Sequence, residues 1–183
     1  MIEFKQVKEE HLQLILDWRT SESITTYMKT DIPKDIEKQK AWYREKIENQ
    51  HDVKHWVIFC ENQPIGFTSI HDDKLTTDSL SWGFYIGNLS YKYLSGLIPL
   101  YFYNYIFMKF SELKFIYGEV LSNNDRMLKI HSMHGCTFLP RLRGAVKKNN
   151  EILDAVPIML TRETWNNMPK IFREFKASFY EYS

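Results

Sequence analysis

The sequence predicts an α/β (α+β) fold, in which one mixed, mostly antiparallel sheet is flanked by helices within a single domain. A chain of 183 residues suits one domain of ordinary size and can bury a substantial core. Its hydrophobic fraction of 44% and charged fraction of 26% are typical of globular proteins. Its periodic segments follow the order β-α-α-β-β-β-α-β-α-β-β-α, which favours a sheet covered by helices.

The first part of the chain predicts one strand and two helices. Residues 2–7 alternate between apolar and polar side chains, as a half-buried strand does. Residues 9–23 carry their apolar side chains on one helical face. Residues 35–50, which follow the break at Pro33, show a second apolar stripe with charges elsewhere.

The middle of the chain predicts three strands and an aromatic helix. Residues 54–73 read as two strands joined by the turn-forming residues 61–64. Residues 78–87 form a third strand in which Trp82 and its alternate neighbours point one way and Gly83 and its neighbours the other. An apolar, aromatic helix is expected to begin near Gly96.

The remaining elements complete the predicted sheet. Residues 114–122 read as a strand, residues 126–135 as a helix that ends at glycine, and residues 136–165 as two long strands around a Lys-Asn-Asn turn. The main domain is therefore expected to span residues 1–165. In residues 166–183 bulky apolar side chains recur every four positions, which predicts an amphipathic C-terminal helix packed on the domain or at a homodimer contact.

Charge and cysteine content exclude several classes of protein. The formal net charge of +1 provides no basic surface for nucleic acid, so no nucleic-acid partner is expected. Of the two cysteines, Cys60 lies inside a strand-like run and Cys136 follows a helix-like run, so neither a disulfide framework nor a thiolate zinc site is expected, and both are expected to be reduced and buried. The apolar run from Leu97 to Met108 is too short to span a bilayer, and the N-terminal residues do not resemble a secretion signal. We therefore expect a cytoplasmic protein without a membrane partner.

The loop before the aromatic helix is a candidate anion site. The first amides of a helix have no intrahelical partners, and the helix dipole attracts phosphate to that end. The available donors would be the amides of Ser95, Gly96, Leu97 and Ile98, because Pro99 has no N–H. A lone Ser-Gly pair before a helix is, however, more often just a helix cap.

Several motifs together resemble the GCN5-related N-acetyltransferase family, over roughly residues 1–165. The segment NDRMLKIHSMHG resembles the family pattern in which Asn124 is followed seven residues later by an aromatic residue or histidine, here His131, and four residues after that by Gly135. The segments LDWRTSESITTYMKTD, WGFYIG, GEVLSNN and MLTRETW resemble more narrowly the branch that acetylates a UDP-linked 4-amino-4,6-dideoxy-altrosamine on the route to pseudaminic acid.

The resemblance implies an acetyl-CoA cosubstrate held between two splayed central strands, with direct attack by the amine in a ternary complex and no metal. It implies that a backbone amide near Phe84, Tyr85 or Ile86 stabilises the oxyanion. His131 takes the place of a tyrosine that protonates the leaving thiolate, which requires a partly charged imidazole. The resemblance also implies that the loop residues named above, together with Asn123, Asn124 and Arg126, contact the coenzyme. Helix capping explains the two asparagines as well. His131 and His134 lack a third ligand nearby, so a metal site is not expected.

Two residues are candidates for the general base. Glu119 is a carboxylate inside an otherwise apolar strand, where it could accept a proton or form a structural ion pair. Ser81 stands where the sugar branch often has an acidic residue, and could hold a water that relays the proton. Each role has a structural alternative that the sequence leaves open.

The acceptor is expected to lie over the first two helices. Aromatic and apolar side chains there suit a sugar or uracil ring, and Arg19 suits a diphosphate. These candidates are Trp18, Arg19, Tyr27, Met28, Trp42 and Tyr43, each of which could instead serve packing alone. A nucleotide-linked amino sugar is therefore the first acceptor hypothesis, and a protein N-terminus or a small amine such as a polyamine is the second.

A non-catalytic domain remains a third hypothesis. The family's phosphate loop reads Gln or Arg, two residues, Gly, one residue, then Gly or Ala, whereas this chain has YLSGLI. Tyr93 and Ile98 depart from that pattern, which would fit a domain that has kept the fold and lost the coenzyme. Saturable binding of acetyl-CoA distinguishes an enzyme from such a domain.

Overall fold

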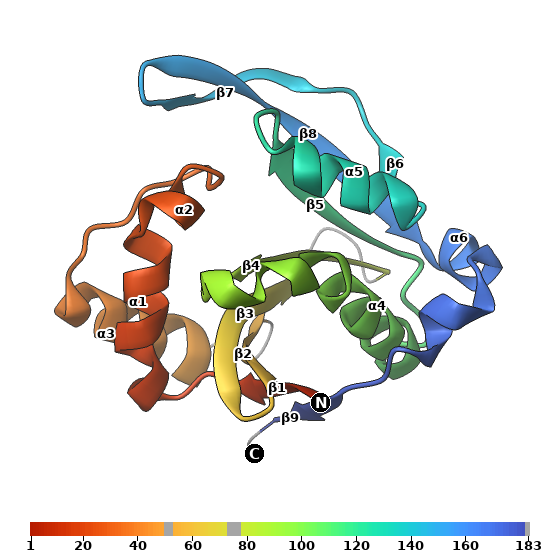
Figure 1. Cartoon of the computed structure of the whole chain (residues 1–183), viewed down its shortest axis with the longest axis horizontal. Coiled ribbons are helices and arrows are strands. Elements are labelled where there is room, and N and C mark those ends of the chain that lie inside the picture. The colour runs from red at the N-terminus through yellow and green to blue at the C-terminus, as the bar shows by residue number, and fades with distance from the viewer. Residues whose placement is uncertain (50–52, 73–77, 182–183) are drawn as a thin grey trace.

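A nine-stranded sheet runs through the computed structural model, which describes residues 1–49, 53–72 and 78–181 (Figure 1). The strand order is β6-β8-β5-β4-β3-β2-β1-β9, and β7 pairs with β8. Among the described pairings only β4–β5 and β1–β9 are parallel, so the expected mixed and mostly antiparallel sheet is confirmed. The strands are β1 (Ile2–Gln6), β2 (Val53–Cys60), β3 (Gln63–Asp72), β4 (Ser79–Ile86), β5 (Phe115–Leu121), β6 (Thr137–Phe138), β7 (Leu142–Lys148), β8 (Glu151–Thr161) and β9 (Ser178–Tyr180).

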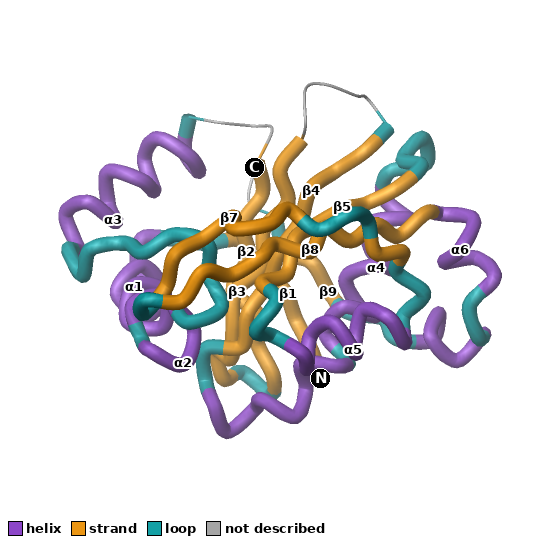
Figure 2. The backbone as a smooth tube through the Cα atoms, turned by 90° about the horizontal axis from the view of Figure 1, so that it is seen from above, coloured by secondary structure: helices purple, strands orange, loops and turns teal. Residues whose placement is uncertain are grey.

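Helices cover both faces of the sheet (Figure 2). The helices are α1 (Leu12–Thr20), α2 (Glu22–Thr25), α3 (Ile36–Tyr43), α4 (Ile98–Lys109), α5 (Asp125–Met133) and α6 (Arg162–Asn167). Short 3₁₀ helices span Glu9–His11, Leu89–Gly96 and Lys170–Glu174, and one π-helical turn spans Arg44–Glu48. Helices α1 to α3 lie on one side of the sheet and α4 to α6 on the other, as the apolar stripes of their sequences require.

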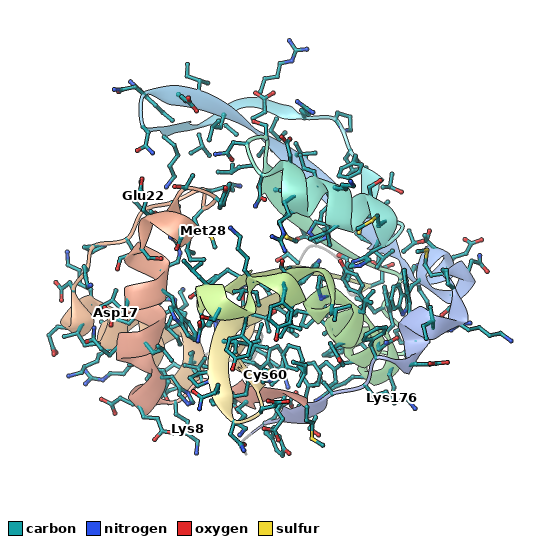
Figure 3. All side chains as sticks on the ribbon, viewed as in Figure 1. Lys8, Asp17, Glu22, Met28, Cys60 and Lys176 are labelled. Carbon is teal, nitrogen blue, oxygen red and sulfur yellow. The ribbon has the colours of Figure 1, made fainter. Side chains whose placement is uncertain are left out.

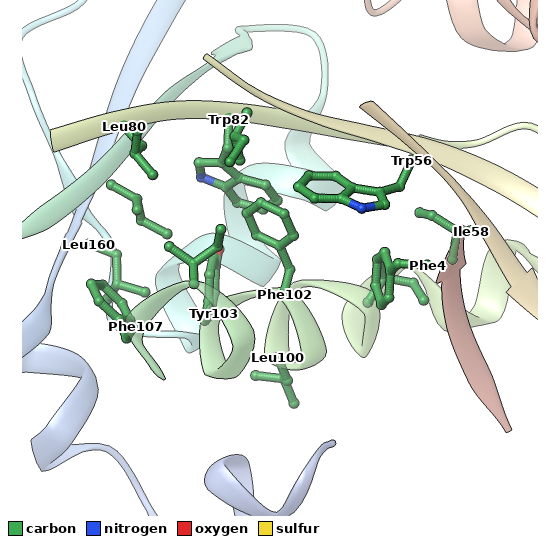
Figure 4. Packing of buried hydrophobic residues seen from close by; sticks show 14 of the residues in the cluster. Phe4, Trp56, Ile58, Leu80, Trp82, Leu100, Phe102, Tyr103, Phe107 and Leu160 are labelled. Atoms are coloured by element: carbon green, nitrogen blue, oxygen red, sulfur yellow. The ribbon is translucent and has the colours of Figure 1, made fainter. Parts of the chain in front are cut away.

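The main core lies between α4 and the sheet (Figure 4). Trp82 of β4 stacks on Phe102 of α4 with ring centroids 4.9 Å apart, and Phe102 also contacts Trp56 of β2 edge to face. The opposite face of the same strands packs against α1, where Val57 meets Leu12. The aromatic helix is thus a core helix, and within the described residues no helix is both long and apolar enough to cross a bilayer.

The central strands β4 and β5 separate after a short parallel pairing. Their register runs from Ser79 opposite Phe115 only as far as Ser81 opposite Tyr117. Beyond that point β4 continues along β3 to Ile86, and β5 continues along β8 to Leu121. The facing edges of β4 and β5 therefore have no ladder partner there, and the expected splay of the central strands is present.

The predicted hairpin turns also agree with the structure. Glu61 and Asn62 join β2 to β3 with φ of 50° and 66°, and Asn149 and Asn150 join β7 to β8 with φ of 48° and 65°. Two successive residues with positive φ match the twist of a two-residue hairpin, and asparagine tolerates this region better than most residues. Local turn chemistry was therefore sufficient to predict both hairpins.

The C-terminal segment differs from the expected amphipathic helix. After α6 it forms the 3₁₀ turn and then β9, which runs parallel to β1. Phe179 stacks between Phe4 and Tyr105, with ring centroids 4.2 Å and 3.5 Å away, and Phe175 contacts Tyr101. The four-residue spacing was wrong as a helix signal because these rings are held by an aromatic stack at the sheet edge. Phe175 and Phe179 are consequently half-buried in their own domain, and a homodimer contact remains only a prediction.

Candidate active site

A cavity of about 340 Å³ opens where β4 and β5 separate. Its walls come from the strands β3, β4, β5 and β8, from α1, α2 and α5, from the 3₁₀ helix Leu89–Gly96, and from the segment that connects α2 to α3, which contributes Met28 (Figure 3). It brings together many of the residues predicted from sequence: Arg19, Tyr27, Met28, Phe84, Tyr85, Ile86, Ser95, Glu119, Asn124, Arg126 and His131. The remaining candidates do not line it: Trp18, Trp42, Tyr43, Ser81, Gly96, Leu97, Ile98 and Asn123.

The candidate anion loop has a different shape from the one expected. Leu89–Gly96 is a 3₁₀ helix capped by Asn88, and α4 begins only at Ile98. The amide of Leu97 donates to the Leu94 carbonyl at 2.8 Å, so the prediction of a free donor at Leu97 is wrong. The 3₁₀ pattern pairs each amide with the carbonyl three residues earlier, which directs the amides of Ser95 and Gly96 along the helix.

Two cations lie beside this 3₁₀ helix at the cavity. Lys92 belongs to the 3₁₀ helix, and Arg126 of α5 donates from Nη2 to the Lys92 carbonyl at 2.9 Å. Ser95 is buried and its hydroxyl donates to the same carbonyl at 2.6 Å. The arrangement holds two positive side chains beside the splayed strands, where they can attract phosphate groups.

His131 lies deep in the cavity and is neutral. It is 4% exposed, and burial lowers its pKa to about 3, with a smaller contribution from His134. Its Nδ1 is 3.2 Å from the Tyr103 hydroxyl, whose own pKa burial raises well above the ordinary value. The expected partly charged imidazole is therefore corrected to a neutral ring that shares a hydrogen bond with the Tyr103 hydroxyl.

Glu119 is exposed instead of buried, which corrects the expectation for this strand carboxylate. It forms an ion pair with Lys29, a residue of the α2–α3 connection on the opposite side of the cavity. The structural alternative, an ion pair, is thus the arrangement observed. Ser81 lies at the last paired position of β4, opposite His71 of β3 and Tyr117 of β5, just before the strands separate.

Three of the six acceptor candidates serve packing. Trp18 is buried and its ring covers Gly87, where an added Cβ would lie 2.2 Å from the indole. Trp42 and Tyr43 pack on the α1 side of the sheet, and Trp42 lies edge to face against His55. The positions of these three rings are therefore explained by packing between the helices and the sheet, and not by contact with the cavity.

The two asparagines before α5 hold local structure. Asn124 caps α5, because its side-chain oxygen accepts from the Met127 amide at 3.3 Å. The side chain of Asn123 donates to the Thr26 carbonyl at 3.4 Å, which ties the α2 region to the turn after β5. The capping interpretation holds for Asn124, although it also reaches the cavity wall.

Arg19 is the acceptor candidate with the most distinctive environment. Its Nη2 donates to the Thr30 carbonyl at 2.6 Å and to the Thr30 hydroxyl at 3.1 Å. Its Nη1 is shielded from solvent and has no hydrogen-bond partner among the described residues. Burial lowers the pKa of this guanidinium, but arginine stays charged in proteins. A buried charged donor without a partner is costly, so an oxygen of a ligand would satisfy it.

Sequence reasoning missed several residues of the cavity wall. They are Ser23, Ile24, Phe67, Ser69, Trp82, Gly83, Leu89, Lys92, Gly118, Val120, Met127 and Ile158. Lys92 could have been found as the cation of the loop before α4. Ser69 carried no such signal, because only the pairing of β3 with β4 brings it to the cavity.

Comparison with known proteins agrees with this geometry. Residues 2–137 match the family described as an acetyltransferase (GNAT) domain. The chain therefore belongs to the GNAT family and is an acetyl-CoA-dependent acetyltransferase. No curated protein matched the sequence.

Solved structures with the same fold are distant in sequence. A spermidine N-acetyltransferase from Vibrio cholerae in complex with CoA and spermine superimposes with a TM-score of 0.80 at 12% identity, covering 91% of this chain and 98% of the other. An aminoglycoside acetyltransferase in complex with coenzyme A gives 0.71 at 14% identity, covering 92% and 99%. These likenesses show the fold.

The residues of the cavity fit a coenzyme A thioester. The unpaired edge of β4 offers backbone amides, and Lys92 and Arg126 offer charge for phosphates. Acetyl-CoA supplies the activated acetyl carbonyl that the acceptor amine attacks. Among the described residues no group of three or more His, Cys, Asp or Glu side chains is placed to hold a metal ion.

Proposed function

We propose that this acetyltransferase acts on the amino group of a nucleotide-linked amino sugar of the UDP-4-amino-4,6-dideoxyhexose type, as in the pseudaminic acid branch. The single observation that carries the proposal is the unpartnered, buried Nη1 of Arg19 in the cavity wall. Because Nη2 is held by Thr30, Nη1 is the free end of the guanidinium, and a diphosphate oxygen can accept a charged hydrogen bond from it, whereas a protonated polyamine has no acceptor to offer.

The charge of the cavity supports an anionic acceptor. Its described wall has three cationic side chains, Arg19, Lys92 and Arg126, and one carboxylate, Glu119. Lys29 already neutralises Glu119. Lys92 and Arg126 would face the coenzyme phosphates, so Arg19 is the cation of the described wall that is left for the acceptor, and its charge favours a nucleotide diphosphate over a polycation. The phenol ring of Tyr27, which is 38% exposed, offers a stacking surface for a sugar or a base.

Cysteine chemistry supports direct attack in a ternary complex. Cys136 is buried, and burial raises the pKa of its thiol to about 11, so it is a poor nucleophile at neutral pH. Cys60 does not line the cavity. Initial-rate measurements with both substrates varied should therefore give intersecting lines, and parallel lines would indicate a covalent acetyl-enzyme instead.

A small amine such as a polyamine is the second candidate. The observation in its favour is Glu119, a carboxylate at the cavity that an ammonium group could pair with if it displaced Lys29. The spermidine acetyltransferase that shares this fold was crystallised with spermine.

An acceptor panel separates the two candidates. Release of free thiol is measured with acetyl-CoA and a UDP-4-amino-4,6-dideoxy sugar, spermidine, kanamycin or an N-terminal peptide. We expect kcat/KM for the nucleotide sugar to exceed that for every other amine, and the free sugar without its nucleotide to be a poor substrate. Preferred turnover of spermidine would overturn the proposal in favour of the second candidate.

A further inference from the structure

Three polar side chains of β2 and β3 lie beside the cavity and have no role so far. Ser69 stands opposite His55 of β2 on one side and opposite Gly83 of β4 on the other. Residues directly opposite in an antiparallel pair share one face of the sheet. The Ser69 hydroxyl is 3.4 Å from Nε2 of His71, and the His71 and His55 rings lie 5.7 Å apart. The three side chains therefore form one continuous polar cluster.

This cluster connects the cavity with solvent. Ser69 is 9% exposed and lines the cavity. Gly83, the next residue across the sheet, also lines it, and a Cβ added there would meet no atom within 4 Å. No side chain therefore separates Ser69 from the space next to β4. At the other end of the cluster His71 is exposed.

His55 indicates that another polar atom belongs in this cluster. It is 4% exposed, and neither ring nitrogen has a hydrogen-bond partner among the described residues. Buried polar groups in folded proteins are almost always paired with protein or ordered water. The rings of Trp42 and Phe67 pack against His55, and the His71 ring lies beside it, so an ordered water on the His71 side would give His55 a partner.

We propose that Ser69 and His71, with His55 behind them, form the path by which the acceptor ammonium loses its proton before it attacks the thioester. This inference rests on acetyl transfer to an amine, but it does not depend on which amine is the acceptor. It supplies the base that neither Glu119 nor Ser81 provides, because Glu119 is ion-paired and Ser81 lies outside the cavity.

The proton balance is simple. The ammonium N–H bond breaks and its proton passes to Ser69 Oγ, while the Ser69 hydroxyl proton passes to Nε2 of His71. His71 then releases one proton to solvent. The neutral amine forms the C–N bond, the C–S bond breaks, and the second proton lost by the nitrogen ends on the sulfur of coenzyme A. The products are the acetamide, the free thiol and one proton in solution.

The surroundings of His71 favour a neutral, proton-accepting ring. Although His71 is exposed overall, partial desolvation of its ring against its neighbours is the larger cause that lowers its pKa, and the charge of Lys46 is the second. The groups that face it are His55 from β2 and Lys46 from the π-helical turn, while Ser81 opposite it on β4 does not titrate. The pKa of His71 therefore lies below the usual histidine value, which favours the neutral, proton-accepting ring at neutral pH.

Kinetics of Ser69→Ala and His71→Gln test the path, with any amine that the wild type acetylates. We expect kcat to fall about tenfold for Ser69→Ala, since water can replace the hydroxyl, and about 10²-fold for His71→Gln. The acidic limb of the kcat/KM profile should disappear in His71→Gln, which a purely structural defect would not cause. The dissociation constant of acetyl-CoA should stay within about twofold of the wild-type value, because neither side chain is expected to hold the coenzyme.

A third variant and a matched control keep the test independent of folding defects. Gly83→Val places a side chain between Ser69 and the cavity in a strand that tolerates valine, so kcat should fall while the melting temperature is kept. His11→Gln, a change at a histidine at the start of α1, should leave kcat and its pH profile unchanged. Wild-type kcat and an intact acidic limb in His71→Gln would overturn the path. Turnover of spermidine instead of the sugar nucleotide would overturn only the acceptor assignment.

Discussion

At the scale of single residues, the proposed acceptor rests on one buried donor of Arg19. Arg19→Lys keeps the charge but removes the planar fork that can satisfy both Thr30 and a diphosphate. A charged hydrogen bond contributes about 1.5–3 kcal/mol, so we expect the acceptor KM to rise about tenfold or more. The KM of acetyl-CoA should not change. Arg143→Lys on β7, which does not line the cavity, is the matched control, and an unaltered acceptor KM in Arg19→Lys would contradict the assignment.

His131 leads to a second prediction at this scale. Because burial holds its pKa at about 3, its ring should stay neutral between pH 5 and pH 8. NMR titration of the histidine ring signals should then show no midpoint for His131 in that range. A midpoint near 6.5 would mean that the ring can be charged, and would restore it as an imidazolium acid for the thiolate.

At the scale of elements, the 3₁₀ helix Leu89–Gly96 replaces the glycine-rich loop that this fold was expected to carry. The charge of Lys92 is therefore expected to provide part of the phosphate binding that free backbone amides would otherwise provide. We expect Lys92→Gln to raise the dissociation constant of acetyl-CoA about tenfold, by loss of a charged contact with phosphate. Calorimetry at two salt concentrations measures this, and the salt dependence should also weaken in the variant.

Lys129→Gln is the matched control for that experiment. Lys129 is exposed on α5 and does not line the cavity, so its removal should leave coenzyme binding unchanged. Equal effects of the two variants would mean that the general charge of the surface, and not Lys92, attracts the coenzyme.

At the scale of the whole molecule, buried neutral histidines link stability to pH. Burial lowers the pKa of His55 to about 3, of His131 to about 3 and of His134 to about 4, against 6.5 for an unfolded histidine. Between those values the unfolded chain binds more protons than the folded one, so the free energy of unfolding falls as pH decreases below 6.5. Each histidine contributes up to about 1.4 kcal/mol per pH unit.

Urea denaturation at pH 7.5 and pH 5.5 measures this linkage. We expect a clearly lower free energy of unfolding at pH 5.5, and a smaller difference between the two pH values in His134→Gln, which removes one of the three groups. An equal free energy of unfolding at both pH values would show that these rings can be protonated inside the fold.

Most strands of the sheet were predictable because their signals are local, whereas the short strands β6 and β9, and the start of α6 at Arg162, were not predicted. Alternation in β4 depends only on neighbouring residues, and the turns at Asn62 and Asn150 depend on the backbone preference of single residues. The tail was not predictable in this way. Phe175 and Phe179 repeat every four residues, but their rings pack against Tyr101, Tyr105 and Phe4 from distant parts of the chain.

The sequence by itself determined the fold class, the family and the neighbourhood of the cavity. Periodicity and motif spacing depend on residues that are close together in the chain, so they can be recognised before any distant contact is known. Only the tertiary structure decided which polar groups in that neighbourhood are charged, paired or open to the cavity. Glu119 is neutralised by Lys29 from across the cavity, and Ser69 reaches the cavity because Gly83 beside it has no side chain. Charge state and access depend on neighbours in space, and those neighbours are set by strand pairing and burial.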